Sequence, residues 1–224
     1  MAELILVRHA QASFGAEDYD KLSELGWRQS RWLGEYFAER GATFDRVIRG
    51  SLRRHTETLA GIAEGMGGLL DGAEDARLDE YDSHSLLHAY AAKCGRPPVL
   101  AQGADRREHF RILREAMYAW TDGTLGSHPH EPFADFRGRV LAALAQMRAG
   151  AVKRVLVVSS GGPISIILAE VLGMPPRGVV DLNLQTRNTG ITELQAGTSR
   201  IQAVSFNNIP HLDRPDRAGA LTYS

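Results

Sequence analysis

An arginine and a histidine stand together where the first apolar run of the sequence ends. Leu4 to Val7 is uninterruptedly apolar, as is typical of a strand buried on both faces of a sheet, and Arg8 and His9 follow it at once. Open α/β sheets bind their ligands at the carboxyl ends of their strands. A neutral imidazole there can attack an electrophile, and the guanidinium beside it can hold an anion. The dipeptide alone leaves open a simpler alternative, a surface ion pair and a histidine bonded to a nearby carbonyl group.

Three more segments place polar residues just after an apolar strand or at the start of a helix. They are Leu52 to Thr58, with Arg53 and Arg54; Leu78 to Glu80; and Ser159 to Gly162. A parallel sheet would bring all three to the edge that holds Arg8 and His9. Together these segments could supply a nucleophile, an anion clamp, an acid and backbone N–H groups that receive an anion.

The elements that would position these groups alternate as in a doubly wound α/β fold. Apolar residues at helical spacing, preceded by Ser23 as an N-cap, predict the first helix. The predicted strands cover 4–8, 44–49 and 154–159; the predicted helices cover 24–40, 52–66, 105–121, 132–147 and 161–172; a C-terminal hairpin joins 189–194 to 201–206.

The middle of the chain differs from this pattern. Residues 81–103 mix His, Ser, Pro and short apolar runs without one clean period, and a Gly-containing loop over 123–129 separates the two helices that follow. We therefore expect an insertion at about 81–130, lying over the sheet. The chain as a whole, 1–224, is predicted to form a single domain with one core.

Composition limits the partners and the compartment. The net charge of -1 gives no electrostatic reason to expect nucleic acid or an acidic membrane surface as a partner. Cys94 is the only cysteine, so the chain cannot form an intrachain disulfide, which fits a reducing compartment. The sequence shows neither a signal-peptide pattern nor a run of membrane-spanning length. These features predict a cytoplasmic protein.

Taken in order, the segments resemble the motifs of the histidine phosphatase superfamily, the phosphoglycerate mutase-like proteins, over nearly the whole chain. Arg8 and His9 look like that family's Arg-His-Gly, with Ala10 in place of the glycine, and Leu22 to Gly26 with Gln29 is similar to its first helix. The resemblance implies an α/β fold of three layers, αβα, with a mostly parallel central sheet. It also implies a helical insertion over the active-site edge.

The second motif departs further from the family pattern, Ser-x-Leu-x-Arg-Ala-x-Gln-Thr. Laying this pattern on Leu52 and Thr58 places its phosphate-binding arginine on Arg54, with Arg53 as the adjacent alternative. The usual serine, alanine and glutamine are replaced by Gly50, His55 and Glu57.

The resemblance implies a phosphomonoester hydrolase that works through a phosphohistidine on His9. Arg8 and Arg54 would neutralise phosphoryl oxygens. Glu80 stands where the family has the glutamate of Leu-x-Glu, and it would protonate the departing alkoxide and then activate water. The Gly-x-Trp-Glu-Gly that usually follows is absent, which leaves a solvated carboxylate as the alternative for Glu80. This scheme uses no metal and no cofactor, and its substrate would be a phosphorylated small molecule.

The largest departure lies after the late strand, where the family reads Ser-His-Gly-Gly and this chain has Ser160 in place of the histidine. The Ser160 hydroxyl and the turn's N–H groups, that of Gly161 among them, can donate to a phosphoryl oxygen, but they bring no full positive charge. Losing a donor of the oxyanion-hole type would cost roughly 3 kcal/mol. A plain helix N-cap is the alternative for Ser160. His84 or His88 of the insertion could instead take the missing histidine's place.

Two functions therefore remain open. One is a phosphomonoesterase, slowed by the loss of the second histidine. The other is a non-catalytic protein that keeps the pocket to bind a phosphorylated metabolite or protein. A mutase reaction of the phosphoglycerate type is disfavoured, because the second histidine and the Trp-Glu-Gly stretch are both missing.

Overall fold

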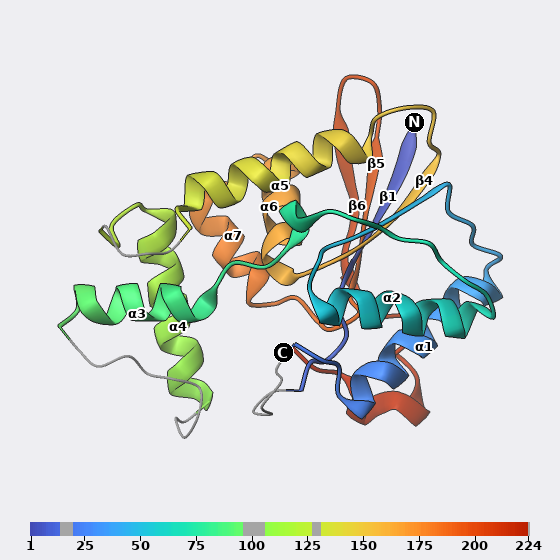
Figure 1. Ribbon diagram of the computed structural model, residues 1–224, viewed down its shortest axis with the longest axis horizontal. Coiled ribbons are helices and arrows are strands. Elements are labelled where there is room, and N and C mark those ends of the chain that lie inside the picture. The colour runs from blue at the N-terminus through green and yellow to red at the C-terminus, as the bar shows by residue number, and fades with distance from the viewer. Residues whose placement is uncertain (14–19, 96–105, 127–130, 224) are drawn as a thin grey trace.

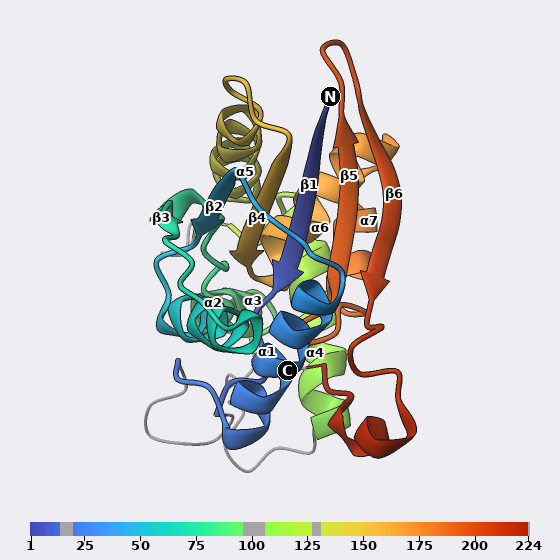
Figure 2. The same ribbon diagram turned by 90° about the vertical axis from the view of Figure 1, so that its right-hand side faces the viewer.

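A computed structural model describes residues 1–13, 20–95, 106–126 and 131–223, and shows a six-stranded sheet between two layers of helices (Figure 1). The strand order is β3-β2-β4-β1-β5-β6, and β1 lies between β4 and β5 in Figure 2. The strands are β1 (Ala2–Arg8), β2 (Arg46–Arg49), β3 (Ala73–Glu74), β4 (Arg154–Ser159), β5 (Ile191–Ala196) and β6 (Ile201–Asn208). The first four strands run parallel, whereas β5 is antiparallel to both of its neighbours. The predicted mostly parallel α/β sheet and its C-terminal hairpin are confirmed.

Helices cover both faces of the sheet, as the three-layer prediction required. One face carries α1 (Glu24–Glu39) and α2 (Arg53–Met66), and the other carries α5 (Phe133–Met147), α6 (Gly161–Leu172) and α7 (Pro176–Asn183). The strand β1 explains the arrangement. Its Leu4 and Leu6 belong to the core under α5 and α6, while Ile5 and Val7 belong to the core under α1 and α2. Because successive side chains of a strand point to opposite faces, an uninterrupted apolar run serves both cores.

Residues 81–103, whose sequence shows no clean period, contain a regular helix, as expected of a helical insertion. Helix α3 (Ser83–Lys93) begins at Asp82, whose carboxylate accepts from the N–H groups of His84 and Ser85. Its buried residues do not fall on one narrow stripe, which explains why the sequence shows no clean period; they are Leu86, Leu87, Ala89 and Ala91. Residues 96–103 of the predicted insertion, and 127–129 of the loop after it, lie outside the described residues.

Helix α4 (Arg106–Thr121) packs against α3 and α7 and lies at the end of the molecule toward which β1 points (Figures 1 and 2). The helical insertion therefore stands beyond the carboxyl ends of the parallel strands. Within the described ranges, none of the helices has the length and apolar character needed to cross a bilayer.

Most predicted boundaries hold to within two residues. The N-cap of α1 is Ser23, whose Oγ accepts from the N–H of Gly26 at 3.0 Å. The sequence reading missed four short elements: β3, α7, and the 3-10 turns η1 (Ala76–Leu78) and η2 (Pro215–Ala220). The turn η1 matters most for the site, since Asp79 and Glu80 follow it directly.

Candidate active site

His9 is fixed at the carboxyl end of β1 and is 3% exposed. Its backbone N–H donates to the carbonyl oxygen of Ser159 at 2.8 Å, which continues the ladder between β1 and β4 by one residue. Its Nδ1 lies 2.8 Å from the carbonyl oxygen of Ala10. A carbonyl only accepts, so Nδ1 carries the proton and the lone pair of the neutral ring is on Nε2.

The protonation state of His9 suits a nucleophile. Burial lowers the pKa of His9 well below its ordinary value, and the charges of Arg54, Arg8 and a third neighbour, His55, lower it further. The ring is therefore neutral at pH 7, with a lone pair available for attack.

The two candidates for the arginine of the second motif have different surroundings. Arg54, the second residue of α2, is 8% exposed, and its Nη1 donates to Asp20 Oδ1 at 2.5 Å. The side chain of Arg53 is 51% exposed and pairs with Glu57 at 2.6 Å. The charge of Arg54 also acts on His9. The structure thus brings Arg54, rather than Arg53, to the candidate nucleophile.

The guanidinium of Arg8 is held by backbone groups. Its Nη1 donates to the carbonyl oxygen of Thr186 at 2.5 Å and to that of Tyr223 at 2.8 Å. Both carbonyls come from the C-terminal part of the chain, which thereby fixes a residue of the first motif. Two guanidinium groups then flank His9, a suitable arrangement for the oxygens of a phosphoryl group.

Glu80 reaches the same place from the end of η1. Its Oε2 accepts from the N–H of Gly162 in the first turn of α6 at 3.1 Å. A Cβ at residue 162 would lie 2.1 Å from Glu80 Oε1, so only glycine leaves room for the carboxyl group. Burial raises the pKa of Glu80, although Arg54 and Arg8 oppose the shift. Arg54 and Arg8 act on both Glu80 and His9, and a carboxyl group with a raised pKa in such a site is suited to general acid catalysis.

Ser160 occupies the N-cap position of α6, but its hydroxyl makes no capping bond. Instead Ser160 Oγ lies 2.8 Å from Nε2 of His55, and both side chains are completely buried. Gly161, the first residue of α6, is packed closely, since a Cβ there would lie 2.3 Å from Asn183 Oδ1.

The sequence reading did not place His55 in the site. It lies in the first turn of α2, and its ring centroid is 5.8 Å from that of His9. Its Nδ1 is 3.6 Å from Oδ1 of Asp79. The sequence signal that could have indicated His55 is a histidine beside the arginine of the second motif, in a chain that lacks the usual histidine at residue 160.

His55, rather than either of the histidines proposed as substitutes, is the histidine whose charge acts on His9. His84 and His88 are exposed on α3, and the charged groups that act most on His9 are Arg54, Arg8 and His55. In the part of the chain that the structure describes, there is no group of three His, Cys, Asp or Glu side chains that could hold a metal ion.

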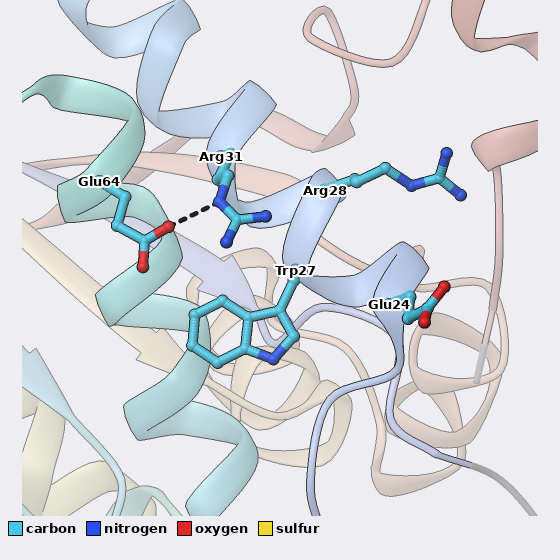
Figure 3. A pocket seen from close by; sticks show the side chains of 5 residues that line it. All are labelled: Glu24, Trp27, Arg28, Arg31 and Glu64. Atoms are coloured by element: carbon cyan, nitrogen blue, oxygen red, sulfur yellow. Dashed lines mark hydrogen bonds and ion pairs between the residues drawn. The ribbon is translucent and has the colours of Figure 1, made fainter.

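A hollow of about 570 Å³ lies away from these residues, on the outer side of α1 and α2 (Figure 3). Two of its charged residues pair with each other, because Arg31 bonds Glu64 at 2.6 Å, and Arg31 also stacks over the Trp27 ring at 5.6 Å. Glu24 and Arg28 complete the lining. The hollow contains none of the groups that act on His9.

Two solved structures have a similar fold, and one protein resembles this sequence over most of its length. Mycobacterial hydrolase 2 is 21% identical, with a TM-score of 0.67 over 98% of this chain and 96% of that chain. A mycobacterial glucosyl-3-phosphoglycerate phosphatase is 23% identical, with a TM-score of 0.64 over 92% of this chain and 99% of that chain. These two likenesses show the fold. The Hydrogenobacter thermophilus protein named "Putative phosphoserine phosphatase 2" is 26% identical over 226 residues, which cover 94% of this chain and 98% of that protein.

The sequence model of the histidine phosphatase superfamily (branch 1) matches residues 4–91 and 100–209. These two stretches include His9 and the four residues of the sequence motifs discussed with it: Arg8, Arg54, Glu80 and Ser160. The chain belongs to the histidine phosphatase superfamily.

Proposed function

We propose that the protein is a phosphomonoester hydrolase that acts through a phosphohistidine on His9. One observation carries the proposal: a buried, neutral imidazole with its lone pair on Nε2 lies beside Arg8 and Arg54. This combination provides a nucleophile and the positive charge that a phosphate ester needs in order to bind next to it.

In the first step, Nε2 of His9 attacks phosphorus while the bond from phosphorus to the ester oxygen breaks. The Nδ1 proton stays on the ring, facing the Ala10 carbonyl, so the phosphorylated imidazole is cationic and remains a good leaving group. Arg8 and Arg54 neutralise the charge that spreads over the phosphoryl oxygens.

Glu80 moves the protons. It donates a proton to the departing alkoxide, then takes one from the water that attacks phosphorus. The second step breaks the nitrogen–phosphorus bond, releases inorganic phosphate, and returns His9 to its neutral form and Glu80 to its acid form.

The pKa shifts of His9 and Glu80 favour the protonation state that this scheme requires, a neutral histidine with a protonated glutamate. At the ordinary values of 6.5 for histidine and 4.5 for glutamate, few molecules would hold a neutral histidine and a protonated glutamate at once. Burial lowers the pKa of His9 and raises that of Glu80, so both shifts enlarge the reactive fraction.

The proposed substrates are phosphomonoesters of small molecules. The name of the Hydrogenobacter relative makes phosphoserine the first compound to test. We further propose that residues 1–224 form one domain in which α3 and α4, at the carboxyl ends of the strands, select the substrate. The single cysteine, Cys94, fits the cytoplasm as its compartment.

The test combines turnover with trapping of the intermediate. The protein should hydrolyse p-nitrophenyl phosphate and phosphoserine, and acid-labile, base-stable label from radioactive substrate should appear on the wild type but not on His9→Ala. Glu64→Gln, a change to a surface carboxylate of α2 that pairs with Arg31, is the control and should behave as wild type. Turnover that survives in His9→Ala would exclude the phosphohistidine mechanism. Phosphate binding without any turnover would favour the non-catalytic alternative.

A further inference from the structure

Three departures from the family's motifs, at Gly50, His55 and Ser160, meet at one place in the structure. His55 and Ser160 are 105 residues apart in the chain, yet His55 Nε2 lies 2.8 Å from Ser160 Oγ. Gly50 lies against the other side of the same ring, where a Cβ would be 2.2 Å from His55 Nδ1. The three departures therefore form one local rearrangement of side chains around the His55 ring, rather than three unrelated substitutions.

Each of the two smaller residues makes room for the imidazole. Any side chain at residue 50, including the serine of the usual pattern, would collide with His55 Nδ1 and would come within 2.6 Å of Asp79 Oδ1. A histidine at residue 160 would compete for the same volume, because even the short serine already reaches the ring at hydrogen-bond distance. Protein interiors are close-packed, so a ring at residue 55 requires small residues at 50 and 160.

The pair is aimed at the place where a phosphoryl group must bind. Ser160 precedes α6, whose N-terminus favours an anion, and its hydroxyl makes no capping bond. The His55 ring centroid is 5.8 Å from the ring centroid of His9. On the far side, Asp79 Oδ1 lies 3.6 Å from His55 Nδ1 and is held by the N–H of Ser51 at 2.7 Å.

We propose that His55 is a positioning residue that replaces the family's second histidine by acting through Ser160. With a proton on Nε2, His55 donates to Ser160 Oγ, and the hydroxyl proton of Ser160 is directed at a phosphoryl oxygen. Neither residue changes its covalent bonds, and His9 remains the nucleophile. The inference rests on the phosphohydrolase function proposed above and deepens it.

We call the two hydrogen bonds from His55 to Ser160 and from Ser160 to a phosphoryl oxygen the relay. The relay also predicts that the protein takes up a proton when phosphate binds. The charged and titratable groups that face His55 are His9 at the end of β1, Arg54 in α2, Asp79 after η1, and Asp20. In the free protein, burial and Arg54 lower the pKa of His55, while Asp79 opposes that shift. A bound dianion would favour the imidazolium, whose Nε2–H faces Ser160 and whose Nδ1–H faces Asp79.

A histidine exchange tests the relay by turnover. His55→Ala and Ser160→Ala should each lower kcat/KM for p-nitrophenyl phosphate by about a hundredfold, as expected for loss of an oxyanion donor. Because the two residues act as a unit, combining these changes should cost no more than the larger single loss. Combining His55→Ala with Ser160→His moves the imidazole to the family's position and should restore most of the lost rate. The inference would be overturned if the two single losses of kcat/KM multiplied in the double alanine variant. It would also be overturned if His55→Ala combined with Ser160→His were no faster than His55→Ala alone.

Binding of inorganic phosphate provides a readout besides turnover. Calorimetry at pH 7 in two buffers of different protonation enthalpy measures the protons taken up. His55→Gln keeps an Nε2 donor but cannot be protonated, so it should take up fewer protons than wild type while retaining more turnover than His55→Ala. Equal proton uptake by wild type and His55→Gln would contradict the relay.

A second buried histidine–hydroxyl pair in this chain controls for lost stability. His211 Nε2 lies 2.8 Å from Thr189 Oγ1, and both residues are buried, as His55 and Ser160 are. His211→Gln, which keeps a donor for Thr189 Oγ1 and so supports that residue's backbone bonds to Arg8 and His9, should lower stability but leave kcat/KM close to wild type; a loss equal to that of His55→Ala would make His55 merely structural. If His9→Ala retains turnover, the proposed function fails, whereas a failed exchange with an inactive His9→Ala refutes only the relay.

Discussion

The proposed mechanism relies on two residues, His9 and Glu80, whose pKa values burial shifts in opposite directions. Desolvation opposes charge on both, so it lowers the pKa of His9 and raises that of Glu80. Arg54 and Arg8 lower both values, because each positive charge disfavours an imidazolium and favours a carboxylate. Burial is the largest cause of both shifts, so the proposed nucleophile and the proposed acid depend on the exclusion of water from this edge of the sheet.

Glu80→Gln should separate the two steps of the reaction. Glutamine keeps the shape of the side chain and an oxygen that can accept from Gly162, but it neither gives nor takes a proton. Nitrophenolate leaves without protonation, so p-nitrophenyl phosphate should still give a burst of about one product per enzyme. Steady-state turnover should fall by about 10²–10⁴, because water is no longer deprotonated.

With phosphoserine, whose alkoxide needs the proton, the same variant should give no burst. Stopped-flow and quench measurements check both substrates. Glu64→Gln, which removes a carboxylate that pairs with Arg31 on the surface, is the matched control and should behave as wild type. If Glu80→Gln hydrolyses phosphoserine at a rate near that of wild type, Glu80 is not the proton donor.

The sequence allowed some of these residues to be assigned and hid others. Arg8 and His9 could be located because strand periodicity marks the end of β1, and Arg54 because its motif could be aligned on Leu52 and Thr58. The contact between His55 and Ser160 could not be predicted, since it depends on how α2 and α6 face each other across 105 residues of chain. Comparison with the family motifs position by position shows two unusual residues, His55 and Ser160, but not the hydrogen bond between them.

At the scale of elements, prediction succeeded where one face of a helix or strand is buried. Helices α1, α2, α5 and α6 appear at their predicted places. In α1 the capping residue and the apolar spacing agree, whereas α2, α5 and α6 form without a side-chain capping bond. The bounds of helix α3 could not be predicted from the sequence, because its buried residues are not confined to one stripe. The turn η1 is only three residues long, too short to produce a period, although it sets the position of Glu80.

The packing of α1 on α2 depends on the absence of a side chain at Gly34. A Cβ there would lie 2.1 Å from the carbonyl oxygen of Ile62 and 2.8 Å from the Cα of Gly65, both in α2. Backbone cannot move aside as a flexible side chain can, so Gly34→Ala should destabilise the protein by about 1–3 kcal/mol. Urea unfolding followed by circular dichroism measures the change.

Gly138 provides the control for helix propensity. It is an exposed interior residue of α5 with no neighbouring atom within 4 Å of an added Cβ, so Gly138→Ala should stabilise by about 0.5–1 kcal/mol. The two substitutions are chemically identical and should shift the urea midpoint in opposite directions. Shifts in the same direction would show that α1 and α2 do not pack as closely as the structure indicates.

At the scale of the whole molecule, buried histidines link stability to pH. His9, His55 and His211 are 3%, 0% and 2% exposed, and burial is the largest cause of the lowered pKa of each. The unfolded chain therefore binds more protons than the folded one below the ordinary histidine pKa, and the folded state loses stability as the pH falls. Glu80 acts in the opposite sense, since its raised pKa favours folding at low pH.

His211 allows the contribution of one buried histidine to be measured without changing any residue of the proposed catalytic group. Burial, with the charge of Arg217, lowers its pKa from 6.5 to about 3. Its Nε2 bonds Thr189 Oγ1, and the described residues give its Nδ1 no hydrogen-bond partner, so a proton placed on Nδ1 would be buried without an acceptor. Its stabilising contribution is complete above pH 6.5 and is lost progressively as the pH falls toward 3.

Between pH 7 and pH 5, wild type should therefore lose about 2 kcal/mol more stability than His211→Gln, which keeps an Nε2 donor for Thr189 but does not titrate. Urea unfolding of each protein at pH 7 and pH 5, in phosphate-free buffer, measures how much stability each one loses between the two pH values. His9, His55 and Glu80 are present in both proteins, so their contributions cancel from the comparison. Parallel dependence of stability on pH in the two proteins would mean that His211 is accessible to protons in the folded state.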